Sequence, residues 1–238
     1  MTARSPRVFL TAEWRHLALL NYRVDPLVLE PYVPRGTELD LWEGGAYVSV
    51  VGFLFQRMRA LGVPIPLHAE FTEVNLRFYV RREVAGETRH GVTFIRELVS
   101  SPLIAGAAKM LYNEPYARAE MSSDVRADGA TYGWRYRARD GVLRVRPSTT
   151  AQIARAGSDE EFMTTRHWGY TAQRDGSTIE YHVGHAPWMV QRCADAELSG
   201  DRAMVFGNVF ANVLFDRPHN AMFANGSAVT LSFPTRIA

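Results

Sequence analysis

The sequence predicts a β-rich α+β fold, in which a curved, largely antiparallel sheet forms a cone or incomplete barrel with a few packed helices. Many segments read as strands, and most connections between them are short. Residues 46–55 are apolar on both faces, so we expect this strand to lie centrally in the sheet. Regular βαβ units are absent, which argues against a doubly wound nucleotide-binding fold.

The N-terminal part of the chain predicts a strand, a short helix and a hairpin. Residues 9–14 read as a strand. Asp25-Pro26 then supplies an N-cap followed by proline at the first helical position, which opens a helix. Glu43-Gly44-Gly45 separates residues 39–42 from residues 46–55 and predicts a hairpin turn.

Strict alternation makes residues 71–80 the most informative strand. One face carries side chains suited to a core: Thr72, Val74, Leu76, Phe78 and Val80. The other face carries a polar row bracketed by aromatic rings: Phe71, Glu73, Asn75, Arg77 and Tyr79. We expect this second face to contact either solvent or the wall of a polar cavity.

The rest of the chain predicts further strands and short helices. A strand at residues 92–98 precedes an alanine-rich helix over residues 101–111. Ser158 caps a short helix that ends near Arg166. We expect the remaining elements to be strands at 178–186 and 190–198, a helix at 201–214 and a strand at 228–233.

Asp140-Gly141 is typical of a type I′ hairpin turn and joins two arginine-rich segments. A turn at this position would place Arg137 opposite Arg144 and Arg135 opposite Arg146. Like charges directly opposite each other are unfavourable. We therefore expect this face to be open to water, or to be neutralised by an anion or an acidic partner.

Composition restricts the class of protein. The 238 residues include one cysteine, Cys193, and carry a formal net charge of +2. Neither a disulfide framework nor long-range attraction to nucleic acid is indicated. No apolar run is long enough to span a membrane, and no signal peptide is evident. We expect one cytoplasmic domain, residues 1–238, with no nucleic-acid or membrane partner.

The common motifs of α/β-hydrolases, Rossmann enzymes, P-loop NTPases and zincins are absent. His182 and His185 fall on opposite faces of a predicted strand, so we expect no metal site and no cofactor. His167 and Trp168 precede a glycine and a tyrosine. This composition could line a ligand pocket or form an aromatic cluster in the core.

The chain contains, in this order, six segments that carry a family resemblance: FLTAEWRHLALLNYRVDP, VPRGTELDLW, FTEVNLRFYV, LYNEPY, HWGYT and IEYHV. They extend over nearly the whole chain. Together they resemble the YqjF-like family, which is grouped with the acetoacetate decarboxylase-like superfamily. The resemblance implies a cone-shaped or barrel-like sheet around a small-molecule cavity, usually in a homo-oligomer.

Decarboxylases of this superfamily form an imine between a substrate ketone and one lysine of an adjacent pair, with an arginine and a glutamate near the substrate. By the resemblance, Arg15 corresponds to the arginine and Glu73 to the glutamate. The lysine pair does not carry over, because its positions fall at about Pro115 and Tyr116. The single lysine, Lys109, is either a displaced nucleophile or an ordinary surface lysine.

The sequence therefore predicts a polar cavity that binds a small carboxylate or carbonyl compound. Arg15 would pair with the anion, Glu73 would act as acid, base or orienting group, and five side chains would line the cavity: Asn75, Arg77, Tyr116, His167 and Trp168. An enzyme of this kind would be a cofactor-free lyase, hydratase or isomerase, and not a lysine-pair decarboxylase. The alternatives are a non-catalytic ligand sensor, and an interaction module that uses the arginine-rich hairpin.

Overall fold

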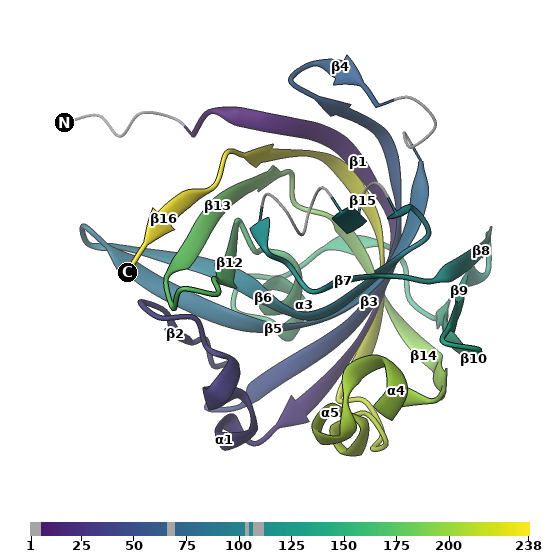
Figure 1. Ribbon diagram of the computed structural model, residues 1–238. Helices are drawn as coiled ribbons and strands as arrows, with labels where there is room; N and C mark the ends of the chain where they lie inside the picture. Colours follow the sequence, from purple (N-terminus) through teal and green to yellow (C-terminus); the bar gives the residue numbers. More distant parts are fainter. Residues whose placement is uncertain (1–5, 66–69, 103–104, 107–111) are drawn as a thin grey trace.

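The computed structural model describes residues 6–65, 70–102, 105–106 and 112–238 and shows a strongly curved sheet with short helices (Figure 1). The first elements are β1 (Val8–Val24), α1 (Pro26–Leu29), the 3₁₀ helix η1 (Glu30–Tyr32), β2 (Glu38–Leu39), β3 (Ala46–Ala60), β4 (Val63–Pro64), β5 (Phe71–Val84) and β6 (Glu87–Val99). The middle elements are β7 (Tyr116–Arg118), β8 (Glu120–Arg126), β9 (Gly129–Tyr136), β10 (Arg139–Pro147), β11 (Gln152–Ile153) and α3 (Asp159–Thr164). The last are β12 (Trp168–Ala172), β13 (Thr178–His185), β14 (Met189–Gly200), α4 (Arg202–Phe206), α5 (Asn208–Val213), β15 (Asn220–Ser232) and β16 (Thr235–Ile237).

In the described residues, the strands form one sheet with the order β16-β13-β12-β6-β5-β3-β1-β15-β14-β10-β9-β8. The pairings along this part of the chain are antiparallel except those of β6 with β12 and with β7. The sheet curls so far that residues 183–185 of β13 also pair with β15 (Figure 1). The predicted curved, largely antiparallel sheet is confirmed, as is the central place of β3 between β1 and β5.

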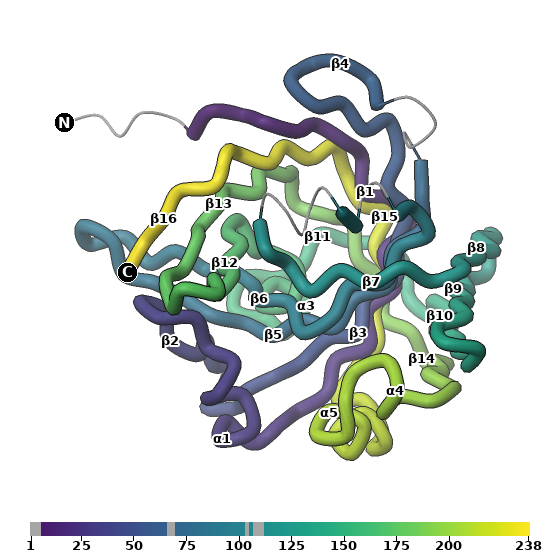
Figure 2. Tube along the Cα trace, in the orientation of Figure 1, coloured from purple at the N-terminus to yellow at the C-terminus, as the bar shows by residue number. Residues whose placement is uncertain are grey.

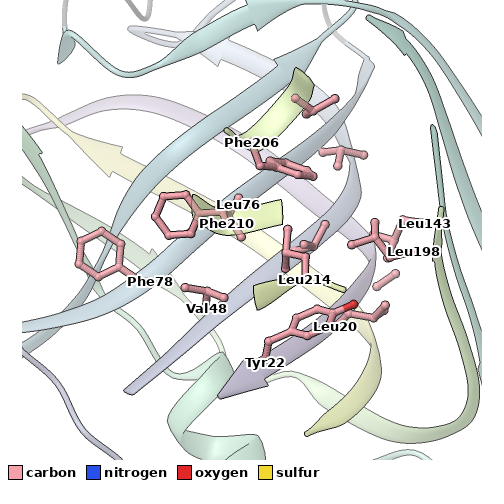
Figure 3. Close-up of a cluster of buried hydrophobic side chains, with 14 of the residues drawn as sticks. Leu20, Tyr22, Val48, Leu76, Phe78, Leu143, Leu198, Phe206, Phe210 and Leu214 are labelled. Atoms are coloured by element: carbon pink, nitrogen blue, oxygen red, sulfur yellow. The ribbon is translucent and has the colours of Figure 1, made fainter. Parts of the chain in front are cut away.

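Strand β5 separates two hydrophobic cores. On one side, side chains from the sheet, from β10 and β14 and from α4 and α5 pack together (Figure 3): Val48, Leu76, Phe78, Leu143, Leu198, Phe206, Phe210 and Leu214. The core on the other side includes Tyr47, Phe53, Tyr79, Met163 and Trp188. Figure 2 shows β8, β9 and β10 extending beyond the curl on one side of the molecule. Because both faces pack, β5 is buried from Phe71 to Val80.

The layer formed by β9 and β10 approaches the central strand closely at Gly52 of β3. A Cβ atom at this position would lie 2.6 Å from the ring of Tyr132 and 2.9 Å from Leu143. Tyr132 is fully buried, and its hydroxyl donates a hydrogen bond to the carbonyl of His16. The tyrosine ring is therefore held in place, and the contact requires glycine at position 52.

The hairpin turn predicted at Asp140-Gly141 is wrong. The turn lies at Arg137-Ala138, where both residues have positive φ angles of 48° and 60°, and Asp140 pairs with Arg135 in the ladder. Core packing explains the difference, because the observed register places Leu143 opposite the buried Tyr132.

The expected row of uncompensated arginines is also absent from this hairpin. Arg135 donates to Asp140 over 2.8 Å, and Arg144 donates to Glu197 of the neighbouring strand β14 over 2.9 Å. Arg146 lies 3.6 Å from Asp195, also in β14. These acidic side chains neutralise the face within the protein itself, so the hairpin offers no unpaired arginine row to an acidic partner.

Three further differences come from local backbone geometry and burial. Strand β2 pairs with β5, and the hairpin expected before β3 is reduced to a bridge between Trp42 and Gly45. Gly207, with φ of 87°, divides the expected helix at 201–214 into α4 and α5. Strand β1 continues to Val24, well beyond the end predicted at residue 14. Residues 17–22 are buried on both faces, so the sequence shows no alternation there.

Other predictions concern the helices. The predicted caps are confirmed, because Asp25 accepts from the backbone of Leu27 and Ser158 from that of Glu161. Most of the alanine-rich helix expected over residues 101–111, including Lys109, lies outside the described residues. No helix in the described part of the chain is long and apolar enough to cross a membrane.

Substituting Gly52→Ala should lower the free energy of unfolding by about 1–3 kcal/mol, because the added methyl group overpacks the contact with Tyr132. Unfolding in urea measures this change. Gly106→Ala is the control, since a Cβ atom there meets nothing within 4 Å. The control should change the free energy of unfolding by less than about 1 kcal/mol. Equal losses in the two variants would contradict the close approach.

Candidate functional site

A cavity lies on the face of β5 that points away from α4 and α5. Strands β1, β3, β5, β6, β7, β12, β13 and β15 all contribute lining residues, so the curled sheet surrounds it. Its volume is about 60 Å³. One water molecule needs roughly 10–15 Å³ of such space, so the cavity accommodates a few waters or a small ligand.

The polar wall of the cavity comes first from β5. Glu73, Asn75 and Arg77 project into the cavity, while Val74 and Leu76 between them pack into the opposite core. The predicted division of this strand into an apolar and a polar face is therefore confirmed. The amide of Asn75 donates a hydrogen bond of 2.8 Å to Oε1 of Glu73, which holds the carboxyl group along the strand.

A bulge in the neighbouring strand β6 brings a second glutamate into the same wall. Arg77 pairs with Phe94, but Asn75 pairs with Glu97, so β6 contains one residue more than β5 over this stretch. The extra residue resets the alternation, and Phe94 and Glu97 both line the cavity although they are three positions apart. Glu97 therefore lies directly beside Asn75.

A third glutamate and two tyrosines complete the polar wall. Tyr116, at the start of β7, pairs with Glu97 and donates a hydrogen bond of 3.3 Å to Oε2 of Glu73. Glu114 lies two residues earlier and accepts a short hydrogen bond from the hydroxyl of Tyr181 on β13. Three buried carboxyl groups thus share one small space.

Burial is the main cause that raises the pKa of each carboxyl group in this cluster. It raises the pKa of Glu73 to about 8 and that of Glu114 to about 7. The pKa of Glu97 is also raised, by burial and then by the charges of Glu114 and Glu73. At neutral pH the cluster therefore retains protons that ordinary carboxylates would have lost.

Several buried polar atoms of the cavity have no hydrogen-bond partner within the described part of the protein: Trp14 Nε1, Asn75 Oδ1, Arg77 Nε and Glu97 Oε2. Buried polar atoms are normally paired with protein or with water. These four atoms in one cavity leave hydrogen bonds available to water or to a polar ligand.

Two arginines line the cavity in different electrostatic states. Arg166 is buried in an ion pair with Asp40 and stacks on the ring of Phe162, 4.0 Å from its centroid. Arg77 donates to the carbonyl of Met163 over 3.1 Å, and its Nε remains unpaired. Among the lining residues that the structure describes, Arg77 is therefore the cationic side chain available to an anion.

Asp40 remains charged beside this cavity. Burial alone would raise its pKa, but the hydrogen bond with His90, at 2.6 Å, and the charge of Arg166 hold the pKa below its usual value. No group of histidine, cysteine, aspartate and glutamate side chains within the described residues has the arrangement needed to hold a metal ion.

The structure places Arg15, the expected anion clamp, on the outer surface of the sheet. Alternation directs Trp14 into the cavity, so its neighbour Arg15 points outward and bonds Glu13 over 2.9 Å. The hydrogen bond from Arg15 lowers the pKa of Glu13. Arg15 is thus part of a surface ion pair and does not line the cavity.

Most of the other expected site residues line the cavity, but not all of them do. Asn75, Arg77 and Tyr116 line the cavity with Glu73, and Trp168 forms part of its wall. His167 lies behind the wall, where its ring contacts His185 with 4.6 Å between the centroids. Lys109 lies outside the described residues.

Sequence reasoning missed five lining residues that matter here: Glu97, Glu114, Arg166, Tyr181 and His185. Glu97 occurs in a predicted strand, but only the bulge directs it inward. Glu114 occurs in the segment Asn113-Glu114-Pro115, whose clearest signal is the end of a helix. An acidic residue in a mostly apolar neighbourhood was the available signal for both glutamates.

Comparison with solved structures shows that the fold is that of the acetoacetate decarboxylase-like proteins. The acetoacetate decarboxylase of Legionella pneumophila has a TM-score of 0.71 at 14% identity, over 100% of this chain and 92% of its own. An acetoacetate decarboxylase-like enzyme of Sphingomonas wittichii has a TM-score of 0.66 at 13% identity, over 100% and 96%. The enduracididine biosynthesis enzyme MppR, complexed with pyruvate, has a TM-score of 0.67 at 12% identity, over 99% and 92%.

The chain belongs to the DUF2071 family, described as an uncharacterized conserved protein, which it matches over residues 11–228. It is also similar to the uncharacterized protein YqjF of Bacillus subtilis, with 29% identity over 190 residues, 78% of this chain and 76% of YqjF. The predicted YqjF-like family is confirmed, and the solved structures confirm the acetoacetate decarboxylase-like fold expected with it.

The carboxyl cluster should make stability fall as pH rises. Each folded-state pKa lies above the usual 4.5, so this stabilising contribution is complete below pH 4.5 and is lost as pH rises through about 7 and 8. Glu97→Gln removes one of the groups that must ionise. Its free energy of unfolding in urea should exceed that of the wild type by more than about 1 kcal/mol at pH 9 and differ little at pH 5.

The control for this variant is Glu87→Gln, which changes an exposed glutamate on the same strand. It should follow the wild type within about 0.5 kcal/mol at every pH. A Glu97→Gln effect of the same size at pH 5 and pH 9 would show that the fold does not raise the pKa of Glu97.

Proposed function

We propose that the cavity binds a small carbonyl or carboxylate compound and catalyses proton transfer at the carbon next to a carbonyl group, without a cofactor. The observation that carries this proposal is that one face of one strand carries both a buried carboxyl group, Glu73, and a buried guanidinium, Arg77, whose Nε has no partner in the described part of the protein. The first group moves a proton, and the second holds an anion.

Arg77 is the anchor for the ligand's carboxylate. Its Nε hydrogen is buried and unpaired, and a carboxylate is the anion that the planar guanidinium fork binds best. Arg166 cannot take this role as readily, because Asp40 already neutralises it. The anchoring role expected for Arg15 therefore passes to Arg77.

Glu73 is the acid-base group. A pKa of about 8 leaves it able both to accept and to release a proton near neutral pH, which is where general acid-base catalysis is most effective. Asn75 and Tyr116 fix its orientation through hydrogen bonds of 2.8 and 3.3 Å.

The step is a simple proton transfer. Glu73 takes the proton from the carbon beside the carbonyl, the C–H electron pair forms the new C=C bond, and the carbonyl oxygen becomes an enolate oxygen. Return of the proton completes isomerisation, and loss of a leaving group from the neighbouring carbon would give a lyase.

Similar structures support the ligand class. MppR was solved complexed with pyruvate, and other similar structures are acetoacetate decarboxylases, whose name describes a keto acid substrate. The positions expected for a lysine pair hold Pro115 and Tyr116 in this chain. An acid-base route through Glu73 therefore fits these residues better than an imine at those positions.

The rate of deuterium incorporation at the methyl groups of pyruvate and acetone in D₂O, followed by proton NMR, tests the catalytic role. The wild type should accelerate this exchange, and Glu73→Gln should slow it by about 100-fold or more, because the general base is lost. Glu83→Gln, an exposed position on the same strand, should leave the rate unchanged.

Lys109→Ala should also leave this exchange unchanged, since no imine is required. Exchange that depends on Lys109 and not on Glu73 would contradict the proposal. Binding of pyruvate without any exchange would instead identify a ligand sensor or binding protein.

Arg77→Met should raise the pyruvate concentration needed for half-maximal exchange by about tenfold or more, because a charged hydrogen bond to the carboxylate is lost. Acetone has no carboxylate, so the same variant should change its exchange much less. Arg144→Met, at an exposed ion pair, is the control and should affect neither compound. An equal effect on pyruvate and acetone would contradict the anchoring role.

A further inference from the structure

Among the described residues, the cavity has more acidic side chains than unpaired cationic ones. Glu73, Glu97 and Glu114 are all buried and line the same space. Of the two arginines that line it, Arg166 is neutralised by Asp40, which leaves Arg77. A carboxylate ligand bound to Arg77 would leave no unpaired cation among the described residues to balance the glutamates when they ionise.

The hydrogen-bond partners of these carboxyl groups are neutral. Asn75 and Tyr116 donate to Glu73, and Tyr181 and Thr171 donate to Glu114. Burial raises the pKa of Glu73 and Glu114, and the hydrogen bonds from these neutral partners only partly offset it. A cation placed among these carboxyl groups would stabilise their ionised form.

Two unpaired atoms on this side call for a hydrogen-bond donor. Oδ1 of Asn75 and Oε2 of Glu97 are buried without a partner in the described part of the protein, and the two residues are direct cross-strand neighbours. An ammonium group has three donors and no acceptor, so one such group satisfies both oxygens.

Aromatic rings also line the cavity: Phe94, Tyr116, Trp168 and Tyr181. The face of an aromatic ring attracts a cation, and the attraction increases where water is excluded. Carboxyl groups bounded by aromatic rings are the combination by which proteins recognise organic ammonium ions.

We propose that the ligand of this cavity is a small zwitterion, whose ammonium group is held by Asn75 and Glu97 and whose carboxylate is held by Arg77. Asn75 and Arg77 are two residues apart on β5, about 7 Å along the strand, which a small amino acid spans with its hydrogen bonds. The inference rests on the proposed function for the role of Arg77 and adds the chemical class of the ligand.

The affinity for a zwitterion should depend on pH in the opposite direction from the affinity for a simple anion. The charged and titratable groups that face Glu97 come from several elements: Glu73 and Arg77 on β5, Glu114 and Tyr116 at β7, Tyr181 and His185 on β13, and Arg166 after α3. An ammonium group binds the ionised carboxylates and displaces their protons, so its affinity rises with pH. A ligand with a carboxylate alone is repelled by the same carboxylates, so its affinity falls.

Isothermal titration calorimetry with β-alanine, propionate and propylamine between pH 6 and pH 9 tests the proposal. The ammonium groups of β-alanine and propylamine titrate near pH 10, so both stay charged throughout this pH range. β-Alanine should bind about tenfold or more tightly than propionate at pH 8.5, and its affinity should rise by up to about tenfold per pH unit below the pKa of the cluster.

Glu97→Gln should abolish the preference for β-alanine over propionate, because the charge that pairs with the ammonium group is lost. Glu97→Asp keeps the charge and should retain the preference with weaker binding. Glu87→Gln, on the same strand and exposed, should match the wild type. Urea unfolding of each variant separates loss of binding from loss of folding.

Propionate that binds as tightly as β-alanine, with affinity that falls as pH rises, would overturn this inference and leave the role of Arg77 in the proposed function intact. A β-alanine preference that persists in Glu97→Gln would also overturn it. Absence of binding by all three probes, together with no deuterium exchange into pyruvate, would reject both the inference and the proposed function.

Discussion

Burial of β5 on both faces is the constraint on which the site depends. Paired with β3 and β6, the strand has its backbone satisfied by the ladder on each side, and the side chains of Val74 and Leu76 anchor it in one core. Alternation then forces Glu73, Asn75 and Arg77 to the opposite face, where water is largely excluded. The polar side chains line the cavity because the apolar side chains of the same strand are fixed in the opposite core.

The protein uses two different solutions for buried acids around this cavity. Asp40 is kept ionised by Arg166 and His90, so it forms a fixed structural ion pair. The glutamates have neutral partners and keep their protons instead, with the pKa of Glu73 raised to about 8. A proton that is held weakly near neutral pH can be transferred to a ligand, whereas a fixed ion pair cannot supply one.

The relation to acetoacetate decarboxylase-like proteins concerns the fold, and the chemistry depends on the side chains in the cavity. Here the positions expected for a lysine pair hold Pro115 and Tyr116, directly after Glu114. A shared curled sheet therefore does not fix which side chains line the cavity.

The sequence by itself determined the sheet, through its many strand-like segments, and the central position of β3, through a run that is apolar on both faces. It also determined the two faces of β5, because side chains alternate along a strand with a period of two. Family resemblance extended this to the cavity and to Glu73. Only the tertiary structure decided that Arg15 points outward, that Glu97 points inward and that the arginine hairpin is neutralised by β14. The reason is that a bulge changes which face a residue occupies and a neighbouring strand supplies ion-pair partners. Neither leaves a periodic signal along the chain.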